Sequence, residues 1–449
     1  LSRSGGEGAD LSYGEVNYLA LDENEKAMLQ NVAEMKKNGT VKKTILLINS
    51  ANALQVDFLK NNEYDIDAAL WIGDVGISGI NAVAEILTGK VNPSGSLVDT
   101  YCYDNFSAPA MWNFTPTTYE GYVEGGDVSA KAKSYMIYQE GIYVGYKYYE
   151  TRYEDFVTGN GNAGDYAYGD IVAYPFGYGD SYTTFAYSNF NVTESDDAFT
   201  VTLKVTNTGK TFSGKETVQI YFQSPYTAYD KANGIEKAAA ELCGFAKTDV
   251  LAPGASEDVT ITVPKSELRT YDANNAKTYI VDAGDYYFTA ATDAHNAVNN
   301  ILAAKGYTVE NTDGRMTADG DVALTYKWTN AALDSTTYAT SENGTAITNL
   351  FDEADPNKSS SEPGEVTWLS RSNWVATFPT QPVVLNATQT LADHLAFTRY
   401  DGSKADSVEM PTLGADNGLA LVSMIGADYD DPQWDTLLDQ LTFNEMVNT

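Results

Sequence analysis

The sequence predicts an α/β domain followed by an all-β domain. Two patterns support this prediction: the first hundred residues alternate between helical and short apolar strand segments, and residues 187–293 alternate polar with apolar side chains. The length of 449 residues is a third indication, because it exceeds what a single hydrophobic core usually supports. We therefore expect two or three domains.

The predicted α/β domain begins with a helix over residues 22–37, which opens with acidic residues, closes with lysines and repeats apolar residues at helical spacing. Residues 44–49 and 68–73 are short apolar runs bounded by polar residues, as in buried parallel strands. A shorter helix is expected over residues 81–87. This alternation indicates a mainly parallel sheet, with Trp71 as a core residue of its strand rather than a sugar platform.

Tyrosine and glycine dominate the segment between residues 100 and 187, above all in the runs 138–150 and 175–185. Glycines allow close backbone approach, and tyrosines fill a seam between elements while their hydroxyl groups find partners. We interpret Glu140, in the first of these runs, as a structural or salt-bridged carboxylate rather than a catalytic one.

Four runs in the next segment have the period of two that marks half-buried strands, namely residues 199–206, 218–222, 258–263 and 285–290. Turn signals rich in glycine, proline and asparagine separate them. Several short strands at this spacing predict a β-sandwich of immunoglobulin-like type over residues 187–295.

Residues 296–428 carry the weakest pattern and are expected to form an extended linker or insertion, anchored by aromatic residues between Trp368 and Phe378. One run in this segment is similar to a Ser-Asp-Trp nucleophile motif, but its central residue is Asn373. A neutral amide cannot act as the carboxylate nucleophile, so we reject this run as a catalytic site.

The composition of the chain limits the chemistry that it can perform. Lys and Arg number 28 against 62 Asp and Glu, and the formal charge of −34 argues against nucleic acid and anionic membrane surfaces as partners. No apolar run is long enough for a membrane span. Cys102, Cys243, His295 and His394 lie in no metal-binding or nucleophile pattern, so we expect no metal and no cofactor. Any catalysis must therefore use carboxylates.

One carboxylate lies in a distinctive glycine-rich loop. Residues 1–10 read LSRSGGEGAD, and the glycines around Glu7 permit backbone conformations that other residues avoid. This run resembles the loop of glycoside hydrolase family 3 that carries the general acid/base; an ordinary surface loop is the alternative. Three further resemblances follow in the family's order: residues 70–95 resemble its α/β sandwich, 138–185 the connection leaving that domain, and 187–295 its fibronectin type III-like module.

The resemblance implies a retaining β-glycosidase, in which two carboxyl groups lie about 5–5.5 Å apart across the scissile bond. An Asp of a (β/α)₈ barrel would be the nucleophile, while Glu7 would protonate the leaving oxygen and then deprotonate the resolving water. Arg3 and Asp10 are the predicted substrate-binding residues; orienting the loop and forming a structural ion pair are the two alternative roles. A β-linked glucoside or oligosaccharide is the expected substrate, with β-glucosidase favoured over β-xylosidase.

Residues 429–449 resemble the opening helices of the family's barrel, with leucines at helical spacing and a Thr442-to-Glu445 capping box. The barrel would then follow the other domains, a permuted order found in one branch of the family. Activity is expected only with this barrel, as a continuation of the chain or as a second chain. The predicted domains are an N-terminally truncated α/β sandwich with its connecting segment (1–186), the β-sandwich (187–295), the linker (296–428) and the barrel opening (429–449).

A second class of function is a non-catalytic carbohydrate-binding or cell-surface module that uses tyrosines as sugar platforms. The Glu7 loop argues against it, because binding alone needs no such acid. The sequence leaves a homodimer open, and it favours a secreted or surface location slightly over the cytoplasm.

Overall fold

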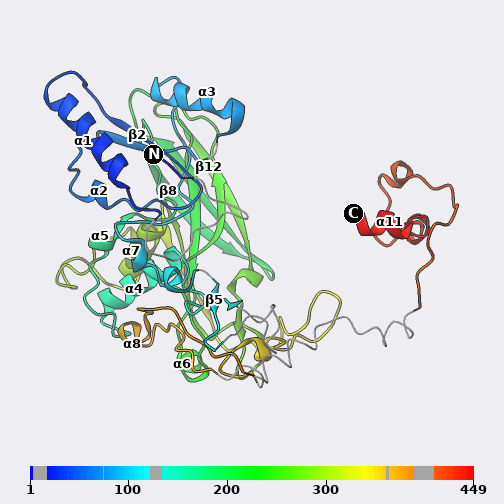
Figure 1. The fold of residues 1–449 in the computed structure, drawn as a ribbon. Helices are drawn as coiled ribbons and strands as arrows, with labels where there is room; N and C mark the ends of the chain where they lie inside the picture. The colour runs from blue at the N-terminus through cyan, green and yellow to red at the C-terminus, as the bar shows by residue number, and fades with distance from the viewer. Residues whose placement is uncertain are drawn as a thin grey trace. The chain divides into compact units, whose positions relative to one another are not determined.

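The computed structural model of the chain describes residues 1–3, 18–73, 75–114, 116–121, 134–359, 364–388 and 409–448. The chain divides into two compact units, Leu1–Ala392 and Asp393–Thr449, and Figure 1 shows the elements of each. Among the residues described, no helix combines the length and the apolar composition needed to cross a membrane.

The first unit opens with a parallel sheet in the order β1 (Ser2–Arg3), β2 (Ile45–Ser50) and β3 (Ala68–Trp71). Helices α1 (Glu23–Lys37) and α2 (Asp57–Lys60) contribute apolar side chains to the core beside this sheet (Figure 1). The two predicted strands and the first predicted helix are therefore confirmed. The core consists of Leu21, Leu29, Leu46, Ile48, Leu54, Val56, Phe58, Tyr64, Ile66 and Tyr101.

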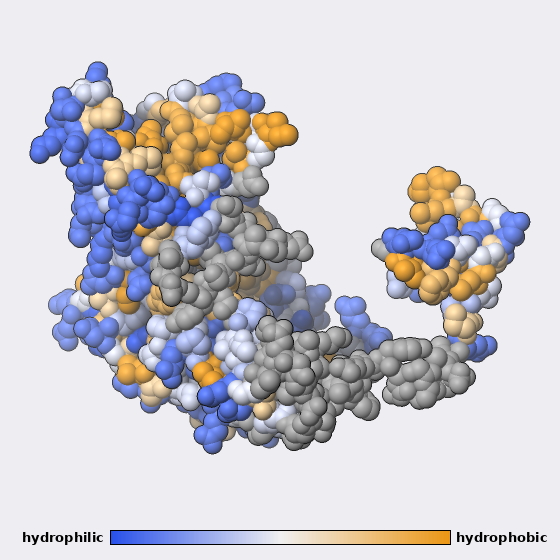
Figure 2. Space-filling view, viewed as in Figure 1, coloured by the Kyte–Doolittle hydropathy of each residue, from blue (hydrophilic) through white to orange (hydrophobic). Residues whose placement is uncertain are grey.

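Helix α3 (Gly76–Leu87) includes the predicted residues 81–87 but begins earlier. Val83 is its one buried residue, and Figure 2 shows a hydrophobic surface in the region of this helix. Trp71 is 36% exposed, and its indole Nε1 donates a hydrogen bond to the carbonyl oxygen of Ser50 at 2.9 Å. The interpretation of Trp71 as a core residue was wrong, because it lies on β3, an edge strand of this sheet, where its side chain stays partly exposed.

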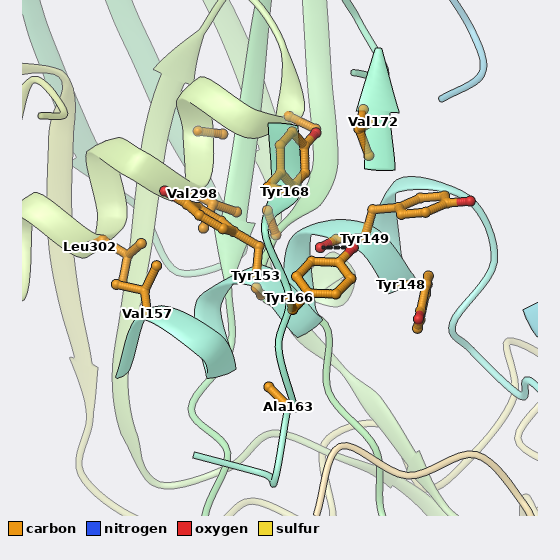
Figure 3. Packing of buried hydrophobic residues seen from close by; sticks show 14 of the residues in the cluster. Tyr148, Tyr149, Tyr153, Val157, Ala163, Tyr166, Tyr168, Val172, Val298 and Leu302 are labelled. Atoms are coloured by element: carbon orange, nitrogen blue, oxygen red, sulfur yellow. Dashed lines mark hydrogen bonds between the residues drawn. The ribbon is translucent and has the colours of Figure 1, made fainter. Parts of the chain in front are cut away.

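A tyrosine-rich core forms around α4 (Tyr146–Thr158), which buries Tyr148, Tyr149 and Tyr153 and packs against α7 (Ala294–Ala304). Figure 3 shows Tyr153 next to Val298 of α7, whereas Tyr148 and Tyr149 lie on the other side of the same cluster. The predicted role of the tyrosines as seam-filling residues is confirmed. The same region contains β4 (Tyr101–Cys102) paired with β7 (Val172–Tyr174), β5 (Thr117–Thr118) paired with β6 (Ser134–Tyr135), α5 (Tyr168–Ile171), and the 3-10 helices η1 (Asn105–Ser107) and η2 (Pro109–Asn113).

The β-sandwich consists of a three-stranded and a four-stranded antiparallel sheet. All four predicted strands are confirmed, and alternate side chains of each face a common apolar core. The first sheet is β12 (Ser256–Pro264), β9 (Ala198–Asn207) and β8 (Phe185–Glu194), and the second is β11 (Glu241–Lys247), β10 (Thr217–Gln223), β15 (Gly284–Ala291) and β16 (Thr325–Asn330). Around them lie α6 (Ala228–Asn233), η4 (Lys265–Leu268), η5 (Val322–Leu324), η6 (Asp352–Ala354) and the hairpin of β13 (Thr270–Asp272) and β14 (Thr278–Ile280).

The segment 296–428 is more than the linker that we expected. Strand β16 lies inside it and pairs with β15 from Thr325 to Asn330, so the sandwich does not end at residue 295. Helix α7 also runs past that boundary and packs on β15. The prediction failed here because β16 is a single short alternating run among turn residues, and its strand character depends on pairing with β15.

The predicted aromatic anchor of this segment is confirmed. Helix α8 (Trp374–Thr377) places Trp374 in the tyrosine-rich core with no exposed surface. Asn373, rejected above as a nucleophile, caps this helix, because its side chain accepts a hydrogen bond from the backbone N–H of Ala376.

The second unit is described over residues 409–448 and contains η8 (Leu421–Met424), α10 (Gln433–Leu438) and α11 (Phe443–Asn448). The capping box is confirmed: the Glu445 carboxylate accepts the backbone N–H of Thr442 at 2.9 Å, and the Thr442 hydroxyl accepts that of Glu445 at 3.3 Å.

Candidate active-site loop and the buried ion-pair networks

The predicted general acid/base Glu7 and the predicted substrate-binding Asp10 lie outside the described residues, in the segment 4–17. Arg3 precedes this segment, and Tyr18 follows it. The predicted roles of Glu7 and Asp10 therefore stay predictions. The structure describes the residues on either side of the segment, Arg3 and Tyr18.

The strand that precedes segment 4–17 ends at the edge of the sheet where the other two strands also end. Strand β1 ends at Arg3, β2 at Ser50 and β3 at Trp71, and because the three strands are parallel these ends lie on the same edge. In open parallel α/β sheets, ligands bind outside the carboxyl ends of the strands. Segment 4–17, which contains Glu7, directly follows such an end along the chain.

Arg3 joins the two ends of this segment through its guanidinium group. Its Nε donates to the carbonyl oxygen of Tyr18 at 2.6 Å, and one Nη2 hydrogen donates to that of Ala20 at 2.7 Å. Two further hydrogens form a fork onto the Glu25 carboxylate at 2.6 and 2.7 Å, and the fifth reaches the carbonyl oxygen of Ser2 at 2.9 Å. We call this arrangement the Arg3 clasp.

The hydrogen bonds of the Arg3 clasp distinguish between the two kinds of role predicted for Arg3, substrate binding and a structural contact. All five N–H groups of Arg3 have protein partners, so a sugar hydroxyl would have to displace one of them. The structure favours the alternative of a structural ion pair, and substrate binding by Arg3 stays a prediction. The sequence contained one usable signal, because Glu25 stands at the third position of α1, where a capping box places it beside Asp22.

Replacing Glu25 by Gln is expected to weaken the clasp while keeping the capping box, since Gln also serves in that motif. The hydrogen bond of Arg3 lowers the pKa of Glu25, so its stabilisation is present above the ordinary Glu range and is lost as the pH falls through the lowered pKa. We expect Glu25→Gln to lower the free energy of unfolding by about 1.5–3 kcal/mol near neutral pH. Urea unfolding and hydrogen exchange over residues 18–25 measure it.

Glu23→Gln is the matched control for this prediction, because Glu23 pairs with Lys26 on the exposed face of the same helix, with 90% of the Glu23 side chain accessible. Such a surface pair contributes little. Equal effects of the two variants would show that the clasp is not a stabilising contact.

A second ion-pair network lies in the tyrosine-rich core and was missed from the sequence. Arg371 is buried, and its guanidinium contacts Asp155 at 2.6 Å and Glu154 at 3.2 Å. Lys305 reaches the other oxygen of Glu154 at 2.7 Å, and the Trp374 indole donates to Asp155 at 2.8 Å. Burial raises the pKa of Glu154, but Lys305 and Arg371 outweigh it and the net shift is downward. This network fastens the segment around residue 371 to α4.

Glu140 is buried, at 5% exposure, which supports its interpretation as a structural residue. The salt-bridged alternative was wrong for the part of the chain described: no ion pair there includes Glu140, and its Oε2 has no hydrogen-bond partner. Burial raises the pKa of this carboxyl group, because a charge is poorly solvated there.

His295 lies in a hydrogen-bonded chain that superficially has the order of a hydrolytic triad. Its Nδ1 is 2.9 Å from the Glu150 carboxylate, and its Nε2 is 2.7 Å from the Thr317 hydroxyl. The Thr317 hydroxyl also accepts from Asn299, and the backbone N–H of Thr317 donates to the Tyr153 hydroxyl at 2.8 Å. That N–H is therefore not free to stabilise an oxyanion, and the chain serves to tie α4 to α7.

The fold and the sequence together define the class of this protein: a parallel α/β domain whose first strand is followed along the chain by the glycine-rich segment with Glu7, and then an immunoglobulin-like sandwich. Comparison with known families agrees. The glycosyl hydrolase family 3 C-terminal domain matches residues 2–146, and the fibronectin type III-like domain matches residues 216–294. The chain therefore contains the C-terminal α/β domain of glycoside hydrolase family 3 and the fibronectin type III-like domain that follows it.

Individual proteins that align with this chain agree with the family matches. The chain is 34% identical over 301 residues to a beta-glucosidase of Ruminococcus albus and 32% identical over 290 residues to beta-glucosidase A of Butyrivibrio fibrisolvens, with 66% and 61% of this chain aligned. The structure of beta-glucosidase 3B from Thermotoga neapolitana in complex with glucose matches 74% of the chain with a TM-score of 0.54 and 27% identity. The chain spans 27%, 30% and 37% of these three proteins, respectively.

Proposed function

We propose that this chain is the non-barrel part of a retaining, exo-acting β-glycosidase and that it supplies the general acid/base Glu7 to a barrel that carries the Asp nucleophile. The observation that carries the proposal is the start of the Glu7 segment at the carboxyl edge of the parallel sheet, with its base held by the Arg3 clasp. Glu7 is four residues beyond Arg3, a stretch of chain that spans at most about 14 Å. The acid would thus act next to that edge.

The reaction uses Glu7 twice. The barrel Asp attacks the anomeric carbon while Glu7 gives its proton to the leaving oxygen, and a glycosyl-enzyme forms. Glu7, now a carboxylate, then takes a proton from the water that releases the sugar. The Arg3 clasp restricts the conformations of the chain on either side of the acid, which reduces the entropy lost when Glu7 is brought to the substrate.

The substrate that we propose is a β-linked glucoside or oligosaccharide, because the relatives named above are beta-glucosidases. We further propose that residues 429–449 open the barrel, supported by the capped helix α11 and its exposed Phe443 and Val447, which leave an apolar surface for further chain to cover. The barrel would then follow the other domains in the chain or be supplied by a second polypeptide.

Reconstitution tests this function. The 449-residue chain alone, and the same chain with its barrel, are assayed with p-nitrophenyl β-D-glucoside and the matching β-xyloside. We expect activity only with the barrel, and a higher kcat/KM for the glucoside. Sugar binding without hydrolysis in both samples would support the carbohydrate-binding alternative instead, and hydrolysis by the chain alone would contradict the two-part active site.

A further inference from the structure

Three buried charged side chains meet in the β-sandwich domain, away from the loop that carries Glu7. Lys237, Asp230 of α6 and Asp282 before β15 have 2%, 0% and 1% of their side chains exposed. The Lys237 Nζ lies 2.5 Å from Asp282 Oδ2 and 3.7 Å from Asp230 Oδ1. With every group ionised, this cluster would hold one uncompensated negative charge in the protein interior, which is costly.

Two carboxylate oxygens of the cluster accept no hydrogen bond from the part of the chain that the structure describes, although the other polar atoms around them are paired. Asp230 Oδ2 accepts from the backbone N–H and the hydroxyl of Thr227 at 2.7 and 2.8 Å, and Lys237 also donates to the Thr270 hydroxyl at 2.6 Å. Asp230 Oδ1 and Asp282 Oδ1 have no hydrogen-bond partner among the residues described, although both are buried. A buried acceptor without a donor is costly, and a proton on one of the two carboxyl groups would supply a donor.

The neighbouring titratable groups do not provide the missing positive charge. Burial raises the pKa of Tyr229 on α6 and of Tyr286 on β15, so both phenols are neutral near pH 7. Asp272 on β13 carries a further negative charge, because Tyr229 and three backbone N–H groups together outweigh its burial and lower its pKa. Among the groups facing Asp282, Lys237 is the one that favours its charged form.

We propose that Asp230 and Asp282 share one proton between their Oδ1 atoms in the folded protein. The proton gives both unpartnered oxygens a hydrogen bond and leaves a neutral cluster of one ammonium and one singly charged carboxyl pair. Burial raises the pKa of Asp282, and Asp230 raises it further, while Lys237 acts in the opposite direction.

The shared proton makes the stability of the domain depend on pH. Because the pKa of Asp282 is raised in the folded state, the stabilisation that the protonated form contributes is fully present below the ordinary Asp pKa and is lost as the pH rises through the raised value. Between these two pKa values, the folding equilibrium constant falls about tenfold per pH unit through this pair. The cluster also touches the network around Arg371, which donates to the carbonyl oxygen of Lys237 at 3.0 Å.

Asp282→Asn tests the proposal, because its amide N–H can replace the shared proton while its oxygen still accepts from Lys237. Hydrogen exchange of peptides covering residues 228–237 and 270–286 is followed against pH in the full chain. The wild type is expected to lose protection as the pH rises, whereas Asp282→Asn keeps it. Infrared difference spectra should show a carboxylic acid C=O band in the wild type that is missing from the variant.

Asp285→Asn is the matched control. Asp285 pairs with Lys327 on the surface and accepts a hydrogen bond from Thr329, contacts that lower its pKa, so this variant should retain the alkaline loss of protection. Parallel pH profiles for wild type and Asp282→Asn, or no carboxylic acid band in the folded wild type, would overturn the shared proton. Asp230→Asn is the second variant if Asp282→Asn does not fold, because one side-chain oxygen can still accept from Thr227 while the amide N–H replaces the shared proton, and it should abolish the same band.

Discussion

Glu7→Gln is expected to lower kcat for an alkyl β-D-glucoside by about 10²–10⁴-fold in the chain joined to its barrel. An alkoxide is a poor leaving group, so its departure needs the proton that Gln cannot donate. A p-nitrophenolate leaving group needs no proton, so with a p-nitrophenyl glucoside the first step should stay fast. The second step, attack of water on the glycosyl-enzyme, should be slowed because Gln cannot act as its general base. Steady-state kinetics on the two substrates, together with the product burst, measure this difference.

Three further measurements separate catalysis by Glu7 from a structural effect. Azide should restore turnover of the activated substrate in Glu7→Ala, because this anion attacks the glycosyl-enzyme without a base. The alkaline limb of the kcat/KM profile, where a general acid loses its proton, should disappear in Glu7→Gln. Glu15→Gln, in the same segment, is the control and should leave both steps unchanged. A normal rate for Glu7→Gln would show that the loop is an ordinary surface loop.

Arg371→Ala is expected to destabilise the first unit by about 3–5 kcal/mol, because it leaves Asp155 and Glu154 buried with one fewer cation. The variant also removes the donor to the carbonyl oxygen of Lys237 and the cation that lies 4.6 Å from the Tyr226 ring centroid. Urea unfolding followed by near-ultraviolet circular dichroism reports on the tyrosine-rich core around this network.

Lys204→Met provides the comparison, since Lys204 forms a surface pair with Asp258 at 3.7 Å, and both side chains are at least 39% exposed. It should change the free energy of unfolding by less than about 1 kcal/mol. If Arg371→Ala were no more damaging than this variant, the segment around residue 371 would not be a stabilising part of the core.

The secondary structure was predictable wherever its cause is local. Helix α1 follows from acidic residues at its start and lysines at its end, and the sandwich strands follow from strict alternation. Strand β16 and the exposure of Trp71 were not predictable, because they depend on which strand lies alongside. A single alternating run or a single apolar strand does not contain that information.

Some features of the candidate site and its surroundings were likewise predictable from local sequence, and others were not. Three features could be read from residue types at short spacing: the glycine-rich segment around Glu7, the lack of metal-binding and nucleophile patterns, and the order of an α/β domain before a β-sandwich. The pairing of Arg3 with Glu25, the pairing of Arg371 with Asp155 across 216 positions, and the burial of two carboxyl groups within 3.7 Å of Lys237 became known only from the folded chain. Charges attract or repel according to distance and burial, and only the folded chain sets both.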